Sequence, residues 1–365
     1  MPWTHRFLRE YLRPRTAAVD VRETTYRRGE RSLPARSYRP AGADSPLPAW
    51  VVLHGLTRTG REHIGLNRFA RAFAAAGNLV LVPEVPEWRA LRVAPAATAE
   101  TIRAAVHALE QRPDVRTGRV GLLAFSFGAT QAVLAGADPE LARLLHGIVG
   151  WGGYADLHAA IRFGLTGAHE LDGVRARMEP DPYGTWIIAG NYLTAIPGYE
   201  EYGDVERALY ALACEAGERG LYAWDPAYDA SKARLGDALP RAHREVFDYL
   251  APPTHQPRRD EPRAHALAEQ LAAAALRTDP GLDPRGRLGG VRTRVLLAHG
   301  RDDRLIPFSE TVRLSRLVPP DRLEACMITG LYAHSGGTLN GLGARQRALE
   351  AARFLQLMHR IVGLV

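Results

Sequence analysis

Short apolar segments alternate with helix-like segments over most of the first 154 residues, and this alternation limits the fold more than any other feature. Buried strands are predicted at 50–55, 78–86, 119–125 and 146–154. Helices are predicted between them, at 67–77, 96–111 and 129–137. Parallel strands need crossover connections of this kind and are buried on both faces. The pattern therefore predicts an α/β protein with a mostly parallel central sheet and helices on both sides of it.

The alternation stops after Tyr154 and resumes at Thr293. Between these points the chain contains Pro-rich joints and helix-like stretches at 204–217 and 262–277, with no pattern of parallel strands. Beyond them, strands are expected at 293–300 and 322–330 and helices at 309–318 and 342–361.

We therefore predict one α/β domain formed by residues 19–154 and 291–365, with a mainly helical insertion at 155–290. An antiparallel hairpin over residues 19–40 begins the domain. Residues 1–18 are predicted to be an N-terminal arm, either a solvated helix or a disordered segment.

Composition excludes several classes of protein. With 46% hydrophobic residues among 365, the chain can bury a large core. The net charge of +7 comes from arginines spread along the chain, so no nucleic-acid partner is expected. Cys214 and Cys326 lie far apart and predict neither a disulfide framework nor a metal site. No apolar run approaches the ~20 residues of a membrane span, and no secretory signal is recognisable. The expectation is a soluble, cytoplasmic protein without a metal or a cofactor.

Ser126 is the candidate nucleophile. The predicted strand 119–125 runs directly into it and a helix begins just after it, so this serine lies on a strand-to-helix turn. Such a turn holds the hydroxyl away from its own backbone, as nucleophilic catalysis requires. Because the chain doubles back there, the residues two positions before and after the serine must be small, and Ala124 and Gly128 meet this need.

Two backbone amides are candidates for an oxyanion hole. The strand 50–55 ends in His54-Gly55, where the glycine lets the backbone turn so that the amide of Leu56 points into the same cleft as the amide of Phe127. For His54, a structural role in anchoring this loop is favoured over a catalytic one. The next residues include Arg58 and Arg61, which would bring positive charge near the mouth of the site.

A carboxylate and a base are expected after the last two strands. Asp302 and Asp303 follow the strand 293–300, at the edge where parallel sheets build their sites, and one of them should orient the base. The base is expected after the next strand, where the loop 331–337 contains His334.

These features, in this order and spacing, resemble the α/β-hydrolase family. The resemblance rests on the Ser126 turn, the His-Gly pair, the segment 299–307 (His-Gly-Arg-Asp-Asp-Arg-Leu-Ile-Pro) and His334, and it covers most of 19–154 and 291–365. It implies a serine esterase or lipase-like α/β-hydrolase fold, with a helical cap inserted after the sixth strand.

The resemblance also implies a role for each polar residue. Ser126 would be the nucleophile, His334 the general base and then acid, and Asp303 the carboxylate that orients His334. Asp302 remains an alternative for the acid, as does Asp156, which lies where some family members carry it. A serine nucleophile argues against dehalogenase and epoxide hydrolase chemistry, which uses an aspartate at this position.

The substrate pocket is less constrained. Candidate pocket residues are His54, Gly55, Trp88, Trp151, Trp186 and Tyr192. Aromatic residues of the insertion would either line a site for an apolar acyl or aryl group or form the core of the insertion itself.

The chemistry predicted is hydrolysis of a small-molecule carboxylic ester through an acyl-enzyme. Acyl transfer, peptide cleavage and C–C bond hydrolysis would use the same groups and remain alternatives. A non-catalytic ligand-binding protein is disfavoured because all three polar groups are present. The apolar C-terminal segment would support a homodimer, but packing onto the sheet explains it more simply.

Overall fold

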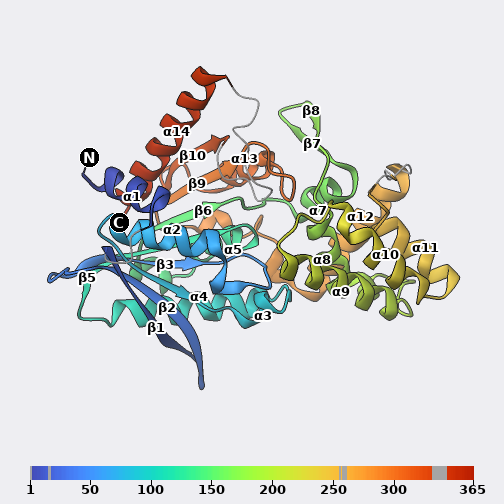
Figure 1. Ribbon diagram of the computed structural model, residues 1–365, viewed down its shortest axis with the longest axis horizontal. Coiled ribbons are helices and arrows are strands. Elements are labelled where there is room, and N and C mark those ends of the chain that lie inside the picture. Colours follow the sequence, from blue (N-terminus) through green and yellow to red (C-terminus); the bar gives the residue numbers. More distant parts are fainter. Residues whose placement is uncertain (1, 15–17, 255, 257–260, 331–342) are drawn as a thin grey trace.

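The computed structural model describes residues 2–14, 18–254, 256, 261–330 and 343–365. A single eight-stranded sheet crosses the molecule in the spatial order β1-β2-β4-β3-β5-β6-β9-β10 (Figure 1). Its strands are β1 (Val19–Arg28), β2 (Arg31–Pro40), β3 (Leu47–Leu53), β4 (Leu79–Pro83), β5 (Val115–Phe125), β6 (Leu145–Trp151), β9 (Val295–Gly300) and β10 (Leu323–Thr329).

The strand directions confirm the predicted parallel sheet. β1 and β2 form the antiparallel hairpin, and β2 pairs antiparallel with β4. From β4 to β10 every neighbouring pair is parallel. β3, β4 and β9 are buried along almost their whole length, which explains why their sequences are continuously apolar instead of alternating.

Helices cover both faces of this sheet, as predicted. One face carries α1 (Pro2–Leu12), α2 (Ile64–Ala75) and α14 (Ala344–Val362), whose apolar side chains pack in one cluster with strand residues such as Trp50 and Val52. The other carries α3 (Pro86–Arg89), α4 (Pro95–Glu110), α5 (Phe127–Ala135), α6 (Leu141–Leu144) and α13 (Phe308–Leu317), packed with residues such as Val51 and Leu122.

The N-terminal segment departs from the expectation of a solvated or disordered arm. Residues 2–12 form α1, which lies beside α2 and α14 (Figure 1). The Phe7 side chain is fully buried, and its ring packs edge-on against Phe69 at 5.8 Å and lies 6.4 Å from Phe354. The amphipathic face of the helix completes the core on that side of the sheet.

Truncating Phe7 should therefore cost stability. In Phe7→Ala we expect the free energy of unfolding to fall by about 3 kcal/mol, because a buried aromatic ring leaves a cavity. Leu12→Ala on the same helix removes a side chain that is 65% exposed and should change it by less than about 0.5 kcal/mol. Urea denaturation followed by circular dichroism measures both. Equal effects of the two changes would contradict the docking of α1.

The chain between β6 and β9 forms the insertion, which lies beside the sheet in green to gold in Figure 1. It consists of α7 (Leu157–Thr166), a hairpin of β7 (Ala168–Leu171) and β8 (Val174–Arg177), α8 (Pro182–Tyr192), α9 (Gly203–Arg219), α10 (Asp229–Asp237), α11 (Arg241–Leu250) and α12 (Glu261–Thr278). The stretches predicted as helical at 204–217 and 262–277 fall within α9 and α12. The hairpin and the shorter helices were not predicted.

A buried carboxylate holds the start of the insertion against the sheet domain. Glu310 of α13 is fully buried and accepts hydrogen bonds from the amides of Ala155 and Asp156 at 3.1 and 2.9 Å. At the other end, the Tyr154 hydroxyl donates to the carbonyl oxygen of Leu282 at 2.8 Å. These contacts join the two points at which the insertion leaves and re-enters the sheet domain.

Within the described residues, every helix is too short or too polar to cross a membrane.

Candidate active site

Ser126 lies at the sharp turn between β5 and α5. Its backbone has φ +59° and ψ −136°, a conformation that costs a non-glycine residue of order 1–3 kcal/mol. The turn is held by the Ser126 amide, which donates to the Trp151 carbonyl oxygen at 2.8 Å, and by the Ala129 amide, which donates to the Ser126 carbonyl oxygen at 2.9 Å. The Ser126 side chain is partly exposed, so its hydroxyl is accessible.

The requirement for small residues around Ser126 has a direct structural cause. A Cβ on Gly128 would lie 2.8 Å from the Trp88 ring and 3.5 Å from the Cβ of Ala124. The first turn of α5 therefore approaches the indole too closely for a side chain at position 128, and the Ala124 Cβ at the end of β5 lies at van der Waals distance.

The two predicted oxyanion-hole residues lie close to Ser126 in the structure. A Cβ on Gly55 would meet the Ser126 Cβ at 3.4 Å, so the loop that carries Leu56 passes in contact with the serine. Phe127 is the first residue of α5, where backbone amides have no carbonyl partner within the helix. Both residues line the same cavity as Ser126.

Asp303 lies buried at the end of β9, with 1% of its surface exposed. Its Oδ1 accepts hydrogen bonds from the amides of Leu305 and Ile306 at 2.9 and 3.1 Å. His299 lies behind it, with Nε2 donating to the carbonyl oxygen of Ile306 at 2.9 Å and lying 3.6 Å from Asp303 Oδ2. The carboxylate is thus held rigidly, and it lines the cavity that contains Ser126.

The other two acidic candidates lie in different surroundings. Asp302 is exposed to solvent. Asp156 caps the N-terminus of α7, where its carboxylate accepts the amides of His158 and Ala159, and it also contacts Arg285 at 3.4 Å. Neither residue lines the cavity described for Ser126. His334, the predicted base, lies outside the described residues.

The cavity has a volume of about 670 Å³ and is bounded by the sheet domain on one side and the insertion on the other. From the sheet domain it is lined by His54, Gly55 and Trp151 together with the residues discussed above. From the insertion it is lined mainly by apolar side chains, including Leu157, Ile161, Ile187, Leu221 and Leu271. Tyr183 and Asp181 of the insertion also line it. Tyr183 is one of the aromatic residues of the insertion that were expected either to line the site or to form the core of the insertion, whereas Asp181 was not predicted.

Three of the predicted pocket residues are structural instead. Trp88 is fully buried beneath the site and packs edge-on against His54 and Phe127. Trp186 is fully buried in the insertion, where its indole N–H donates to the Leu250 carbonyl oxygen at 3.2 Å. Tyr192 is 3% exposed, and its hydroxyl donates to Asp279 at 2.7 Å. These rings fill the cores of the sheet domain and of the insertion. None of the three residues is among the described residues that line the cavity.

The arginines of the loop after Leu56 do not bring their charge into the cavity. Arg58 pairs with Glu218 of α9 at 2.9 Å, and Arg61 pairs with Glu23 of β1 at 2.7 Å. Among the described residues that line the cavity, none is an arginine or lysine. The described part of the chain also contains no group of three or more His, Cys, Asp or Glu side chains arranged to hold a metal ion.

The topology and strand order define this chain as having the α/β-hydrolase fold. A solved structure supports that assignment at low sequence identity. The uncomplexed acylaminoacyl peptidase from Pyrococcus horikoshii matches with a TM-score of 0.51 and 12% identity over 96% of this chain. This chain spans 43% of the length of that peptidase.

Two further solved structures match with lower TM-scores. Brefeldin A esterase, described as a bacterial homologue of human hormone sensitive lipase, matches at 0.49 and 15% identity over 99% of this chain and 84% of the esterase. 2,6-Dihydroxy-pseudo-oxynicotine hydrolase matches at 0.41 and 18% identity over 96% of this chain and 72% of the hydrolase. No family model matches the sequence, and neither does any curated protein sequence.

Proposed function

We propose that this protein is a serine hydrolase that cleaves carboxylic esters through an acyl-enzyme. The observation that carries the proposal is the position of Ser126, on a strained turn at the floor of a largely apolar cavity that Leu56, Phe127 and Asp303 also line. A non-glycine residue in such a backbone conformation persists only where the surrounding structure enforces it, and such sites are commonly functional.

The proposed reaction has two halves. Ser126 Oγ attacks the ester carbonyl carbon while His334 takes the hydroxyl proton, and the amides of Leu56 and Phe127 stabilise the oxyanion. The C–O bond then breaks, and the alcohol leaves with the proton from His334. Water, deprotonated by His334, attacks the acyl-enzyme, and the carboxylic acid is released as Ser126 regains its proton. Asp303 keeps the imidazole of His334 in the required tautomer. The role of His334 rests on its place in the sequence.

The cavity supports an uncharged, apolar substrate. Its lining is mainly aliphatic and aromatic, and the two arginines of the loop after Leu56 are paired with glutamates outside the lining. A substrate carboxylate would meet no cationic side chain among the described lining residues. A volume of about 670 Å³ accommodates a medium-length acyl chain or an aryl group.

A fluorophosphonate probe and a series of p-nitrophenyl esters from acetate to decanoate test the proposal. We expect the probe to label Ser126 and kcat/KM to rise with acyl length, by about fourfold per buried methylene, until the cavity is filled. The matched control compares the 4-carboxybutyryl ester with the valeryl and hexanoyl esters. The 4-carboxybutyryl ester should be the poorer substrate, because its carboxylate would meet no cationic side chain among the described residues that line the cavity.

Other outcomes would redirect or overturn the proposal. Labelling of Ser126 without ester turnover would contradict ester hydrolysis and favour acyl transfer, peptide cleavage or C–C bond hydrolysis by the same groups. Absence of labelling would contradict a serine nucleophile and favour a ligand-binding protein.

A further inference from the structure

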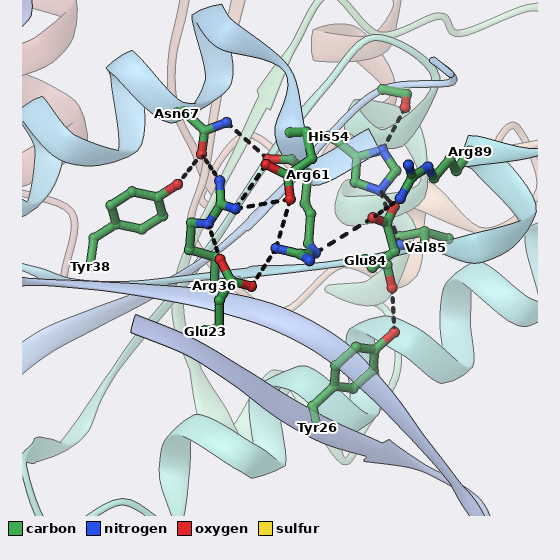
Figure 2. Close-up of polar contacts among 12 residues, drawn as sticks. Glu23, Tyr26, Arg36, Tyr38, His54, Arg61, Asn67, Glu84, Val85 and Arg89 are labelled. Carbon is green, nitrogen blue, oxygen red and sulfur yellow. Dashed lines mark hydrogen bonds and ion pairs between the residues drawn. The ribbon is translucent and has the colours of Figure 1, made fainter. Parts of the chain in front are cut away.

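A buried carboxylate lies directly behind the loop that carries Leu56. Glu84 follows β4, is 3% exposed and does not line the described cavity. Its carboxylate lies 3.3 Å from His54 Nε2, 3.4 Å from Arg89 and 3.6 Å from Arg61 (Figure 2). Burial raises the pKa of this carboxyl group, whereas the positive charges of Arg89 and Arg61 lower it, and the pKa lies below its usual range. Glu84 is therefore ionised at neutral pH without contacting solvent or substrate.

Glu84 also packs against the backbone of the loop. Gly60 has φ +52°, and a Cβ at that position would lie 2.3 Å from Glu84 Oε1. Only glycine allows the loop to approach the carboxylate this closely, and its positive φ is one that other residues rarely adopt. The turn after Leu56 is thus shaped around the Glu84 side chain.

His54 connects Glu84 to the residues beside Ser126. Its Nδ1 donates to the carbonyl oxygen of Gly55 at 2.7 Å, and its Nε2 lies 3.0 Å from the amide nitrogen of Val85, which donates to it. The imidazole is therefore held on both nitrogens, on one side by the peptide that leads into Leu56 and on the other by the chain around Glu84. The orientation of that peptide sets the direction of the Leu56 amide.

The remaining contacts balance the charge of this cluster. Three glutamates (Glu23, Glu62 and Glu84) face three arginines (Arg36, Arg61 and Arg89). Figure 2 shows Arg61 between Glu23 on β1 and Glu84. The Tyr26 hydroxyl of β1 donates to the Glu84 carbonyl oxygen at 2.6 Å. Through these contacts, the loop that carries Leu56 is connected to β1 at the antiparallel edge of the sheet.

We infer that Glu84 is a positioning residue for the oxyanion hole, acting through His54 and Gly60 on the Leu56 amide. The inference rests on the proposed function, because it assigns a role in the same site. Since Glu84 does not line the described cavity, its effect must appear in stabilisation of the oxyanion and not in binding of the substrate in its ground state.

Glu84→Gln is the test, with Glu23→Gln as the matched control. Both remove one carboxylate charge from the cluster and both lose a contact with Arg61, but only Glu84 contacts His54 and Gly60. We expect Glu84→Gln to lower kcat about 10- to 100-fold, as a displaced donor should, with KM within about twofold of the wild type. Glu23→Gln should leave both constants within about twofold.

A pair of inhibitors separates positioning from a general loosening of the site. An aryl or alkyl trifluoromethyl ketone forms a tetrahedral adduct with Ser126 that places an oxyanion in the hole, whereas the corresponding trifluoromethyl carbinol fills the cavity without one. In Glu84→Gln the affinity for the ketone should fall by the same factor as kcat/KM, while the affinity for the carbinol is unchanged. Equal losses for both inhibitors, or no loss for the ketone, would overturn the inference.

A second variant covers the case in which Glu84→Gln fails to fold because its arginine partners lose their counter-charge. Glu84→Gln/Arg89→Gln restores the charge balance, and Arg89 is half-exposed. It should show the same selective loss of ketone affinity, and wild-type ketone affinity would overturn the inference. Failure of the proposed function is distinguishable, because the wild-type protein itself would then neither hydrolyse esters nor bind the ketone more tightly than the carbinol.

Discussion

Ser126→Ala should lower kcat for any ester that the wild-type protein hydrolyses by at least about 10⁴-fold, and labelling by a fluorophosphonate should disappear. The change removes the only atom that forms the acyl bond, so water would have to attack directly in a site that keeps its oxyanion donors. Initial-rate kinetics and gel fluorescence measure the two effects.

The fold should survive this substitution. Alanine occupies the same backbone conformation at φ +59° at the same cost, and the side chain removed is partly exposed. Thermal unfolding should therefore shift by no more than about 2 °C. Ser32→Ala, at an exposed position on β2, is the matched control and should retain activity and labelling. Ester hydrolysis that persists in Ser126→Ala would show that the reaction takes place elsewhere.

Asp303→Asn should lower kcat about 10³- to 10⁴-fold, the second largest effect that we expect. An asparagine carbonyl oxygen can still accept the amides of Leu305 and Ile306, which Oδ1 accepts at 2.9 and 3.1 Å, so the loop should keep its shape. What is lost is the negative charge that holds the histidine tautomer and stabilises the imidazolium in the transition state.

Two matched variants identify the acid unambiguously. Asp302→Asn changes an exposed residue, and Asp156→Asn changes the cap of α7, where asparagine is an equally good cap. Both should keep kcat within about threefold of the wild type. A loss of the size expected for Asp303→Asn in either of them, with Asp303→Asn active, would transfer the role of the acid to that residue.

The sheet was predictable because its signal is local. Strands such as β3, β4 and β9 are apolar along almost their whole length, and amphipathic helices follow them, so segments of about 5 to 15 residues already carry the information. The turn at Ser126 is equally local: a strand, a serine and a helix are consecutive, and the small residues that it needs lie two positions away. The corresponding expectations for the sheet and its covering helices are confirmed.

The insertion and the N-terminal segment were less predictable. Several short helices of the insertion contain glycine and proline, and α8 is apolar on all sides, so periodicity gives little indication of which face is buried. Residues 1–18 were predicted to be an N-terminal arm, but Phe7 packs against rings on α2 and α14, which lie some 60 and 350 residues further along the chain.

What could be predicted from the amino-acid sequence therefore depends on how far apart along the chain the interacting residues lie. Backbone conformation and hydrophobic periodicity depend on neighbours in the chain. The succession of strands and helices along the chain and the turn at Ser126 could therefore be predicted from local patterns. Which aromatic rings face the cavity is decided by tertiary packing and not by neighbours in the chain. Trp151 lines the cavity, whereas Trp88 and Trp186 are fully buried in the cores beneath and beside it. The pairing of Glu84 with His54 and Gly60 joins the ends of two strands, and only the packing of the sheet brings these residues together.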